Sequence, residues 1–189
     1  MTTVLNLYGG PGAGKSTMAA YLFYLLKTHR LNTELVREYV KDWAWEKRNI
    51  STYDQMYIAG KHVRKESLLL GKVDFMVTDY PVLLSIFYSK KFSTSTLAQG
   101  VESMVQKYYE QAESEGHRFV HIFLNRDFEY DAEGRYQTEA EAKEMDGEII
   151  SLLHDYTRQF RVMTASPDEM LGLVKELAHA HYRWLQTPT

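Results

Sequence analysis

A glycine-rich segment that directly follows a short apolar run leaves few folds open to this chain. The run Val4–Tyr8 is typical of a buried strand, and the next residues are Gly9-Gly10-Pro11-Gly12-Ala13-Gly14-Lys15-Ser16-Thr17. This segment matches G-x-x-x-x-G-K-[ST] at every fixed position, and a helix is expected to follow over about 15–30. A strand, a glycine-rich turn and the start of a helix, in this order, predict a phosphate-binding loop.

The residue types in this loop suit an anionic ligand. Glycines let the backbone turn its N–H groups inward around phosphate oxygens, and Lys15 carries a compact positive charge towards the β and γ phosphates. The Ser16 hydroxyl can ligate Mg²⁺, and the helix that follows points its positive end at the same anion. A flexible glycine turn is the alternative, but both the residues and their context argue against it. We therefore predict that a nucleotide contacts Gly9, Gly10, Gly12, Ala13, Gly14, Lys15, Ser16 and Thr17.

Length and composition narrow the classes of protein to which this chain can belong. A chain of 189 residues is the size of one domain, so we expect a single domain over 1–189. A net charge of −3 argues against a dedicated nucleic-acid binder, and the lack of cysteine excludes disulfides, thiolate zinc sites and a cysteine nucleophile. The N-terminus has no export signal, and no apolar stretch approaches the roughly 20 residues of a membrane span. We therefore expect a cytoplasmic protein without a membrane partner.

Strand and helix patterns alternate along the rest of the chain. Short β-rich runs are expected at 33–37, 73–78, 118–124 and 160–163, and helical periodicity at 53–70, 96–115, 139–160 and 167–185. This alternation predicts a three-layer α/β fold, with a mostly parallel sheet covered by helices on both faces. A segment at about 126–138 lacks helical periodicity and is interpreted as a lid-like loop. In such folds ligands bind beyond the carboxyl ends of the strands.

Two carboxylates stand at predicted strand ends. Asp79 closes the apolar run 73–78 and resembles the Walker B position, where it would hold Mg²⁺ together with Ser16, directly or through water. Alternatively, Asp79 begins the turn before Pro81. Glu38 ends the second strand, where it could take a proton from a substrate hydroxyl or bind a sugar. Its alternative is an ordinary salt bridge with Arg37 or Lys41.

Two arginines flank the lid-like loop. A guanidinium is a natural partner for phosphate oxygens during group transfer, so Arg126 and Arg135 are predicted to clamp phosphate. The alternative is a solvated pair tied to acidic residues of the loop, which are Asp127, Glu129, Asp131 and Glu133.

Aromatic and basic residues gather in several places. Within the group Tyr39, Trp43, Trp45, Tyr53 and Tyr57, the spacing of four favours core packing for most members, with base stacking as the alternative. Tyr80 and Tyr136, each beside a proposed site element, are predicted to contact the substrate. The clusters at 61–65 and 90–91 could meet a polynucleotide backbone, although a solvated helix face explains the first equally well.

Four segments together carry a resemblance to a known family: Gly-Gly-Pro-Gly-Ala-Gly-Lys-Ser-Thr, Leu-Val-Arg-Glu-Tyr, Val-Thr-Asp-Tyr-Pro and Gly-Arg-Tyr-Gln-Thr-Glu-Ala-Glu-Ala. They resemble small P-loop kinases, often carried by phages and known only as ATP-binding proteins. In layout the chain is similar to nicotinamide riboside kinases and deoxynucleoside kinases.

The resemblance implies a P-loop NTPase fold, with the phosphate loop on a central strand of a five-stranded parallel sheet. It also implies phosphoryl transfer from ATP. It assigns phosphates to 9–17, metal to Ser16 and Asp79, and lid roles to Arg126 and Arg135, and it places Glu38 near the acceptor hydroxyl. Deoxynucleoside kinases commonly have an acidic–arginine pair after the third strand, where this chain has Asp79-Tyr80-Pro81.

The function expected from these observations is an ATP-dependent kinase acting on a hydroxyl or phosphate of a nucleoside- or nucleotide-like acceptor. One alternative is a kinase that phosphorylates a hydroxymethyl-pyrimidine base in phage DNA, which would act in the host cytoplasm. Another is a non-kinase ATPase or nucleotide-binding switch. The sequence leaves open the acceptor, a homodimer, the choice between ATP and GTP, and which carboxylate acts as the base.

Overall fold

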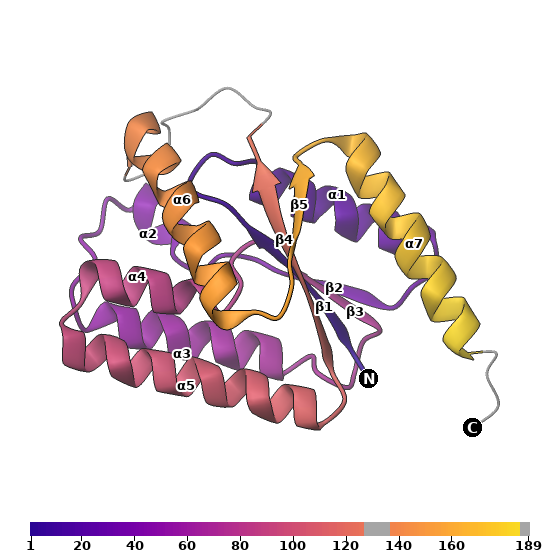
Figure 1. Cartoon of the computed structure of the whole chain (residues 1–189), viewed down its shortest axis with the longest axis horizontal. Helices are drawn as coiled ribbons and strands as arrows, with labels where there is room; N and C mark the ends of the chain where they lie inside the picture. Colours follow the sequence, from indigo (N-terminus) through magenta and orange to yellow (C-terminus); the bar gives the residue numbers. More distant parts are fainter. Residues whose placement is uncertain (127–136, 186–189) are drawn as a thin grey trace.

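A five-stranded, fully parallel sheet forms the centre of the computed structural model (Figure 1), which describes residues 1–126 and 137–185. The strand order is β2-β3-β1-β4-β5, so the strand that leads into the phosphate loop is the central one. The strands are β1 (Thr3–Tyr8), β2 (Thr33–Val36), β3 (Phe75–Thr78), β4 (Arg118–Asn125) and β5 (Arg161–Thr164). All carboxyl ends therefore meet at one edge of the sheet.

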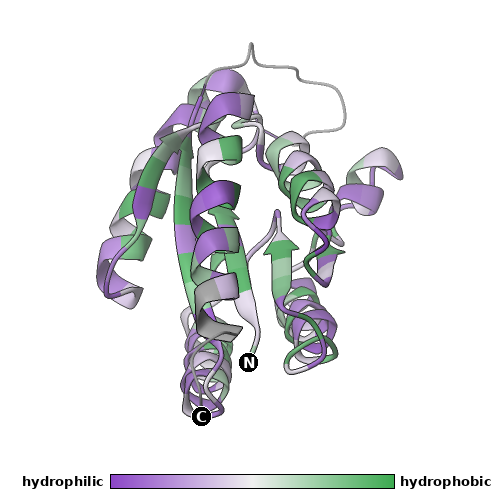
Figure 2. Cartoon of the chain, turned by 90° about the vertical axis from the view of Figure 1, so that its right-hand side faces the viewer, coloured by the Kyte–Doolittle hydropathy of each residue, from purple (hydrophilic) through white to green (hydrophobic). Residues whose placement is uncertain are grey.

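Helices cover both faces of the sheet (Figure 2). They are α1 (Lys15–Thr28), α2 (Lys41–Trp45), α3 (Asp54–Ser67), α4 (Leu84–Phe92), α5 (Ser95–Ser114), α6 (Glu139–Tyr156) and α7 (Pro167–Leu185). Side chains alternate across a strand, so Leu5 and Leu7 of β1 join a core with α1 and α7, whereas Tyr8 joins a core with α3, α4, α5 and α6. Burial of both faces explains why the inner strands β1 and β3 are buried along almost their whole length, whereas the edge strand β5 is partly exposed.

The expected fold class is confirmed, with five parallel strands and helices on both faces. Two helices were not predicted. The helix α2 has only five residues, too few to show a period, and α4 is buried on most sides, so it lacks a polar stripe. The helix α6 ends at Tyr156, earlier than the expected end at 160. In the described part of the chain, no helix is long and apolar enough to cross a bilayer.

Candidate nucleotide and acceptor site

The phosphate loop connects the central strand β1 to the first turn of α1. Its backbone has positive φ at Gly9 (137°), Gly12 (80°) and Gly14 (81°), a region that residues with a Cβ rarely adopt. Gly14 is also the residue that caps the N-terminus of α1. The Lys15 ammonium folds back over the loop, where Nζ donates to the carbonyl oxygens of Gly9 (2.7 Å) and Gly10 (2.9 Å).

Three carboxylates from three different elements act on Lys15. Burial lowers the pKa of the ammonium from its ordinary value, while the negative charges of Glu38, Asp79 and Asp146 act in the opposite direction. Glu38 follows β2, Asp79 follows β3, and Asp146 lies on α6. The carboxyl edge of the sheet therefore brings together the charges that a phosphate and metal site requires.

Arg126 and Asp146 attach the phosphate loop to α6. The Gly10 N–H donates to Asp146 Oδ1 (2.5 Å), and Arg126 Nε donates to Asp146 Oδ2 (2.7 Å). The two terminal nitrogens of Arg126 donate to the carbonyl oxygens of Pro11 (2.7 Å) and Ala142 (2.9 Å). Arg126 is thus in an ion pair whose side chains are only 15% and 18% exposed, whereas the alternative considered from the sequence was a solvated pair with acidic residues of the loop. The partner, however, is a helix residue that periodicity did not single out.

Replacing Gly10 with alanine is expected to disturb this attachment. A Cβ at this position would lie 2.5 Å from the Ala142 carbonyl oxygen, 2.8 Å from Arg126 Nη2 and 2.9 Å from Asp146 Oδ1. We expect Gly10→Ala to lower the free energy of unfolding by about 1–3 kcal/mol, because the crowded atoms include backbone that must shift. Urea denaturation measures this change.

The control is Gly100→Ala on α5, where a Cβ would meet nothing within 4 Å. Alanine there should raise stability by roughly 0.5–1 kcal/mol through its better helix propensity. An unchanged urea midpoint for Gly10→Ala would contradict the packing described here.

Asp79 holds the backbone beside Glu38. Asp79 is 3% exposed, and its Oδ1 accepts a hydrogen bond from the Glu38 N–H (2.7 Å). The strands β2 and β3 are neighbours in the sheet, which explains how a carboxylate at one strand end reaches the peptide at the other. Asp79 and Glu38, which the sequence placed at separate strand ends, are therefore joined.

The oxygen ligands near the loop suit Mg²⁺ better than a metal ion that is bound by protein side chains alone. Within residues 1–126 and 137–185, no group of three or more His, Cys, Asp or Glu could hold a metal ion. Mg²⁺ usually takes one or two protein oxygens and completes its shell with phosphates and water. The Ser16 hydroxyl, which lines the cavity described next, and the Asp79 carboxylate fit that requirement.

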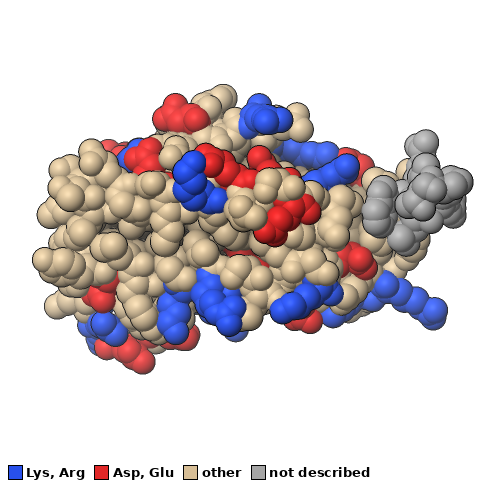
Figure 3. Space-filling view, turned by 90° about the horizontal axis from the view of Figure 1, so that it is seen from below, with Lys and Arg blue, Asp and Glu red and all other residues tan. Residues whose placement is uncertain are grey.

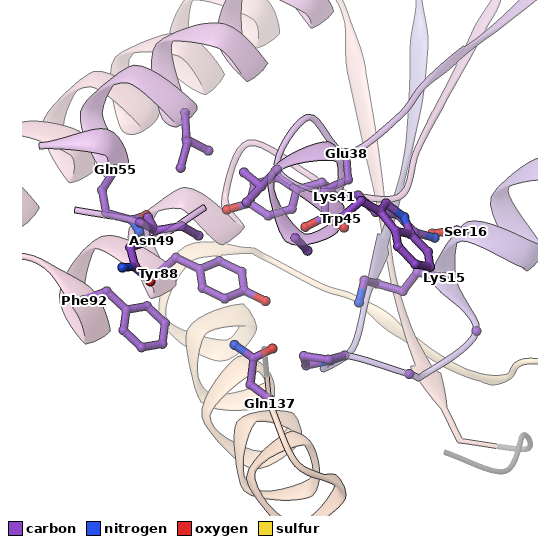
Figure 4. Close-up of a pocket in the computed structure, with 18 of the residues that line it drawn as sticks. Lys15, Ser16, Glu38, Lys41, Trp45, Asn49, Gln55, Tyr88, Phe92 and Gln137 are labelled. Carbon is purple, nitrogen blue, oxygen red and sulfur yellow. The ribbon is translucent and has the colours of Figure 1, made fainter. Parts of the chain in front are cut away.

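A cavity of about 650 Å³ joins the phosphate loop to an aromatic chamber (Figure 4). At one end lie the loop residues Gly12, Gly14, Lys15, Ser16 and Thr17. At the other end lie Asn49, Gln55, Tyr88 and Phe92, which come from the segment after α2, from α3 and from α4 (Figure 4). The lining also includes Trp45, Ile50 and Tyr80. Glu38, Lys41 and Gln137 also line the cavity, which is large enough for a small ligand.

Glu38 acts electrostatically on both ends of this cavity. Its charge raises the pKa of Lys15 in the loop, against the larger effect of burial. It also raises the pKa of Tyr80 and Tyr88, for which burial is again the largest cause. Tyr88 points its hydroxyl into the cavity (Figure 4). A carboxylate close to both the phosphate loop and the chamber is well placed to take a proton from a ligand that lies in the chamber next to the loop.

The aromatic residues after β2 depart from the prediction of core packing. Trp43 is buried as expected, but Trp45, Tyr53 and Tyr57 are 56%, 76% and 46% exposed, so the prediction is wrong for these three. The reason is the shortness of α2, which leaves Trp45 at its last turn and puts Tyr53 immediately before α3. Trp45 instead lines the cavity, a role the spacing did not indicate.

Several other residues of the site were not found from the sequence. They are Lys41, Asn49, Gln55, Tyr88, Phe92, Gln137 and Asp146. Gln137 could have been found, since it belongs to the Gly-Arg-Tyr-Gln-Thr segment that carries part of the family resemblance. The others come from elements that periodicity assigned only to the core or left unassigned. Tyr80 lines the cavity, as a substrate contact would. Arg135 and Tyr136 lie outside the described residues.

A family model described as AAA domain matches residues 4–169. The chain belongs to this family. Among curated proteins, no sequence match to this AAA domain was found. Its five-stranded parallel sheet, with the phosphate loop after the central strand, is a P-loop NTPase-like fold.

Solved structures share the fold of this AAA domain at low sequence identity. A NadR protein in complex with NR matches all of this chain with a TM-score of 0.69 and 12% identity, over 53% of the NadR chain. NadR in complex with NAD and AMP-PNP matches all of this chain with a TM-score of 0.67 and 11% identity, over 51% of its own length. The structure of APE1195 matches 95% of each chain at a TM-score of 0.50 and 16% identity. The AAA domain thus spans about half the length of the two NadR chains.

Proposed function

We propose that this protein is a kinase that transfers the γ-phosphoryl group of Mg·ATP to a hydroxyl of a nucleoside-like acceptor. The observation that carries the proposal is the single cavity in which the phosphate loop opens into a second, aromatic chamber, with Glu38 beside both. Hydrolysis requires only a water molecule, whereas a second chamber can hold and orient an organic acceptor. The NadR structures, described as complexes with NR and with NAD and AMP-PNP, support a nucleotide and a nucleoside-like ligand in this fold.

The lining of the chamber favours a nucleobase. Tyr88 and Phe92 offer aromatic faces, on which bases stack. Asn49, Gln55 and Gln137 offer carboxamides, each with both donors and an acceptor, which suit the edge of a base.

The charges of the lining favour a hydroxyl acceptor over a phosphate acceptor. The charged side chains among the described lining residues are Lys15, Glu38 and Lys41, and none of these residues is an arginine. A phosphate acceptor would favour a guanidinium clamp in the chamber. A carboxylate there would repel a phosphate but can accept a proton from a hydroxyl.

Each residue then has a defined part in the transfer. Backbone N–H groups of 9–17 bind the phosphates, and Lys15 neutralises the charge that develops on the transferring group. Ser16, and Asp79 through water, would hold Mg²⁺, which supplies neutralisation of the β and γ phosphates when bound. Glu38 accepts the proton of the acceptor hydroxyl while the hydroxyl oxygen forms a bond to the γ-phosphorus. At the same time the bond between the γ-phosphorus and the bridging oxygen breaks, and that oxygen leaves with ADP.

The remaining predicted residues complete this assignment. Tyr80 and Tyr136 would contact the acceptor, and Arg135 would approach the phosphates. Arg126 positions the phosphate loop through Asp146 and Pro11 in this structure, so a direct contact with phosphate would require exchange of one of those bonds.

A hydroxymethyl-pyrimidine base within DNA is the second candidate acceptor, and one surface feature favours it. Residues 37–65 include seven lysines and arginines against four acidic residues, although the whole chain carries −3. On α3, the exposed Tyr57 has the Lys61 ammonium 5.4 Å from its ring centroid. The face seen in Figure 3 carries Lys and Arg together with Asp and Glu side chains, without one sign of charge covering it. Cations interleaved with exposed rings are typical of surfaces that bind single strands.

The test is a phosphoryl-transfer assay with radiolabelled ATP, Mg²⁺ and a panel of acceptors. The panel contains nucleosides, nucleoside monophosphates, and oligonucleotides with and without hydroxymethyl pyrimidines. We expect label in free nucleosides; label in the hydroxymethyl oligonucleotide alone would select the second candidate. ADP formation at the same rate with and without every acceptor would overturn the kinase proposal and favour an ATPase.

Phe92→Ala is expected to weaken acceptor binding alone. Loss of one base-stacking face should raise the KM for the acceptor about tenfold, and the KM for ATP should stay unchanged because Phe92 lines the end of the cavity away from Lys15 and Ser16 (Figure 4). The control is Tyr24→Ala, which removes a 60% exposed ring from α1. If the KM for ATP rises and that for the acceptor does not, the chamber has been assigned to the wrong ligand.

A further inference from the structure

A buried histidine behind the cavity wall contacts the backbone next to Glu38. His62 of α3 is 1% exposed, and its Nε2 accepts a hydrogen bond from the Tyr39 N–H (3.3 Å). Because Nε2 accepts, the ring proton is assigned to Nδ1, which has no hydrogen-bond partner among the described residues. Burial lowers the pKa of His62 to about 3, with a smaller contribution from the positive charge of Lys65, so the ring stays a neutral acceptor.

Two more side chains hold the same short segment. The Glu38 N–H donates to Asp79 Oδ1 (2.7 Å), and Lys65 Nζ donates to the Arg37 carbonyl oxygen (3.1 Å). Each of the three consecutive residues 37–39 therefore has one backbone group bonded to a side chain from α3 or from the end of β3. The acceptor side chains Asp79 and His62 are both buried, so their bonds hold the backbone of this segment more firmly than the exposed bond from Lys65 can.

The ring of His62 also supports the aromatic wall of the cavity. It packs on Tyr80 with ring centroids 4.2 Å apart, and Tyr80 stacks on Tyr88 at 5.6 Å and an interplanar angle of 15°. Tyr80 and Tyr88 both line the cavity. One side chain thus contacts the two parts of the site that must be aligned, the Glu38 segment and the acceptor wall.

We infer that His62 is a positioning residue, which acts through the Tyr39 peptide to hold Glu38 against the acceptor hydroxyl. Its kinetic consequence rests on the proposed function, whereas the hydrogen bond can be tested without activity. A small displacement of a reacting group can lower the rate by a large factor. The hydrogen bond from the Tyr39 N–H to His62, although it lies outside the cavity, can therefore affect turnover.

Two substitutions separate the hydrogen bond from the ring. His62→Phe keeps a ring against Tyr80 but cannot accept from the Tyr39 N–H, whereas His62→Gln keeps an acceptor oxygen but lacks the ring. We expect His62→Phe to lower kcat roughly 10- to 100-fold with little change in the KM for ATP, because the phosphate loop is untouched. His62→Gln should recover most of kcat.

The control is a second buried histidine that also accepts a backbone N–H. His117 is 8% exposed, and its Nδ1 accepts from the Thr2 N–H (3.0 Å) beside the start of β1, at the end of the sheet opposite the phosphate loop. His117→Phe should lower stability as His62→Phe does, but leave kcat unchanged.

Amide hydrogen exchange gives the readout that is independent of activity. The Tyr39 amide should exchange at least about tenfold faster in His62→Phe than in wild type, and close to the wild-type rate in His62→Gln. A folded His62→Phe with wild-type kcat, or equal losses of kcat in both variants, would overturn the inference.

Two further results remain decisive. If wild type transfers no phosphoryl group to any acceptor, the proposed function fails, while the Tyr39 exchange rate still decides whether His62 holds the segment. If His62→Phe does not fold, a tenfold loss of kcat in folded His62→Gln with unchanged Tyr39 exchange would overturn the inference.

Discussion

Lys15→Met is expected to lower acceptor-dependent phosphoryl transfer by about 100- to 1,000-fold, the range seen when one preorganised charge-stabilising donor is removed. The Lys15 ammonium folds over the loop onto the carbonyl oxygens of Gly9 and Gly10. It also lies within the influence of three carboxylates, and without it their negative charge would oppose a bound triphosphate. The loss should therefore appear both in kcat and in the affinity for Mg·ATP, measured by initial rates and by calorimetry.

The control for this charge is Lys107→Met on α5. That side chain is 73% exposed and pairs with Glu110 on the same helix, so its removal should change neither rate nor binding. Wild-type turnover in Lys15→Met would show that the loop does not carry the transferred group, and the proposed function would then be wrong.

Glu38→Gln is expected to lower kcat by about 100- to 10,000-fold, the usual contribution of a positioned general base. The substitution preserves size, and the bond from the Glu38 N–H to Asp79 belongs to the backbone, so the segment should keep its conformation. The KM for ATP should change little.

Glu34→Gln tests whether any carboxylate on this strand has the same effect. Glu34 lies on β2, close to Glu38 in sequence, with its side chain 49% exposed and 3.7 Å from the Lys27 ammonium. Its replacement should leave kcat unchanged. Full turnover in Glu38→Gln would remove Glu38 from the mechanism and leave Asp79 as the carboxylate to test.

The structure itself favours Glu38 over Asp79 as the base. Glu38 lines the cavity, whereas Asp79 is absent from its described lining and uses Oδ1 to accept the Glu38 N–H. A base must approach the proton that it removes to hydrogen-bond distance. In the sequence, both residues stand at the end of a predicted strand, which left open which of them acts as the base.

The fold was accessible from the sequence because its signals are local. Apolar runs of strand length, helical periodicity and the match of 9–17 to a phosphate loop each depend on residues close together in the chain. The expected sheet is confirmed, and the missed helices are α2, which is short, and α4, which is buried on most sides. The predicted site residues remain predictions, although the structure shows Lys15, Ser16, Glu38 and Tyr80 lining one cavity.

The partners of those residues could not be predicted in the same way. Arg126 meets Asp146 on α6, and His62 meets the Tyr39 peptide across the space between α3 and β2. Helical periodicity and turn signals relate only residues that are close together in the sequence, and neither pair is. From the sequence, any acidic residue near Arg126 was therefore an equally good candidate for its partner. The exposure of Trp45 likewise depends on where a five-residue helix ends.

By itself, then, the sequence determined the strand-loop-helix unit, the parallel sheet and the edge at which polar residues collect, because backbone conformation and burial patterns are written in neighbouring residues. Only the tertiary structure decided which carboxylate faces the cavity, what holds it there, and that the phosphate loop shares one cavity with an aromatic chamber. Those features arise because side chains of α1, α2, α3 and α4 and of the segments after β2 and β3 meet at one edge of the sheet. Such meetings depend on how the elements pack, for which a single sequence carries no local signal.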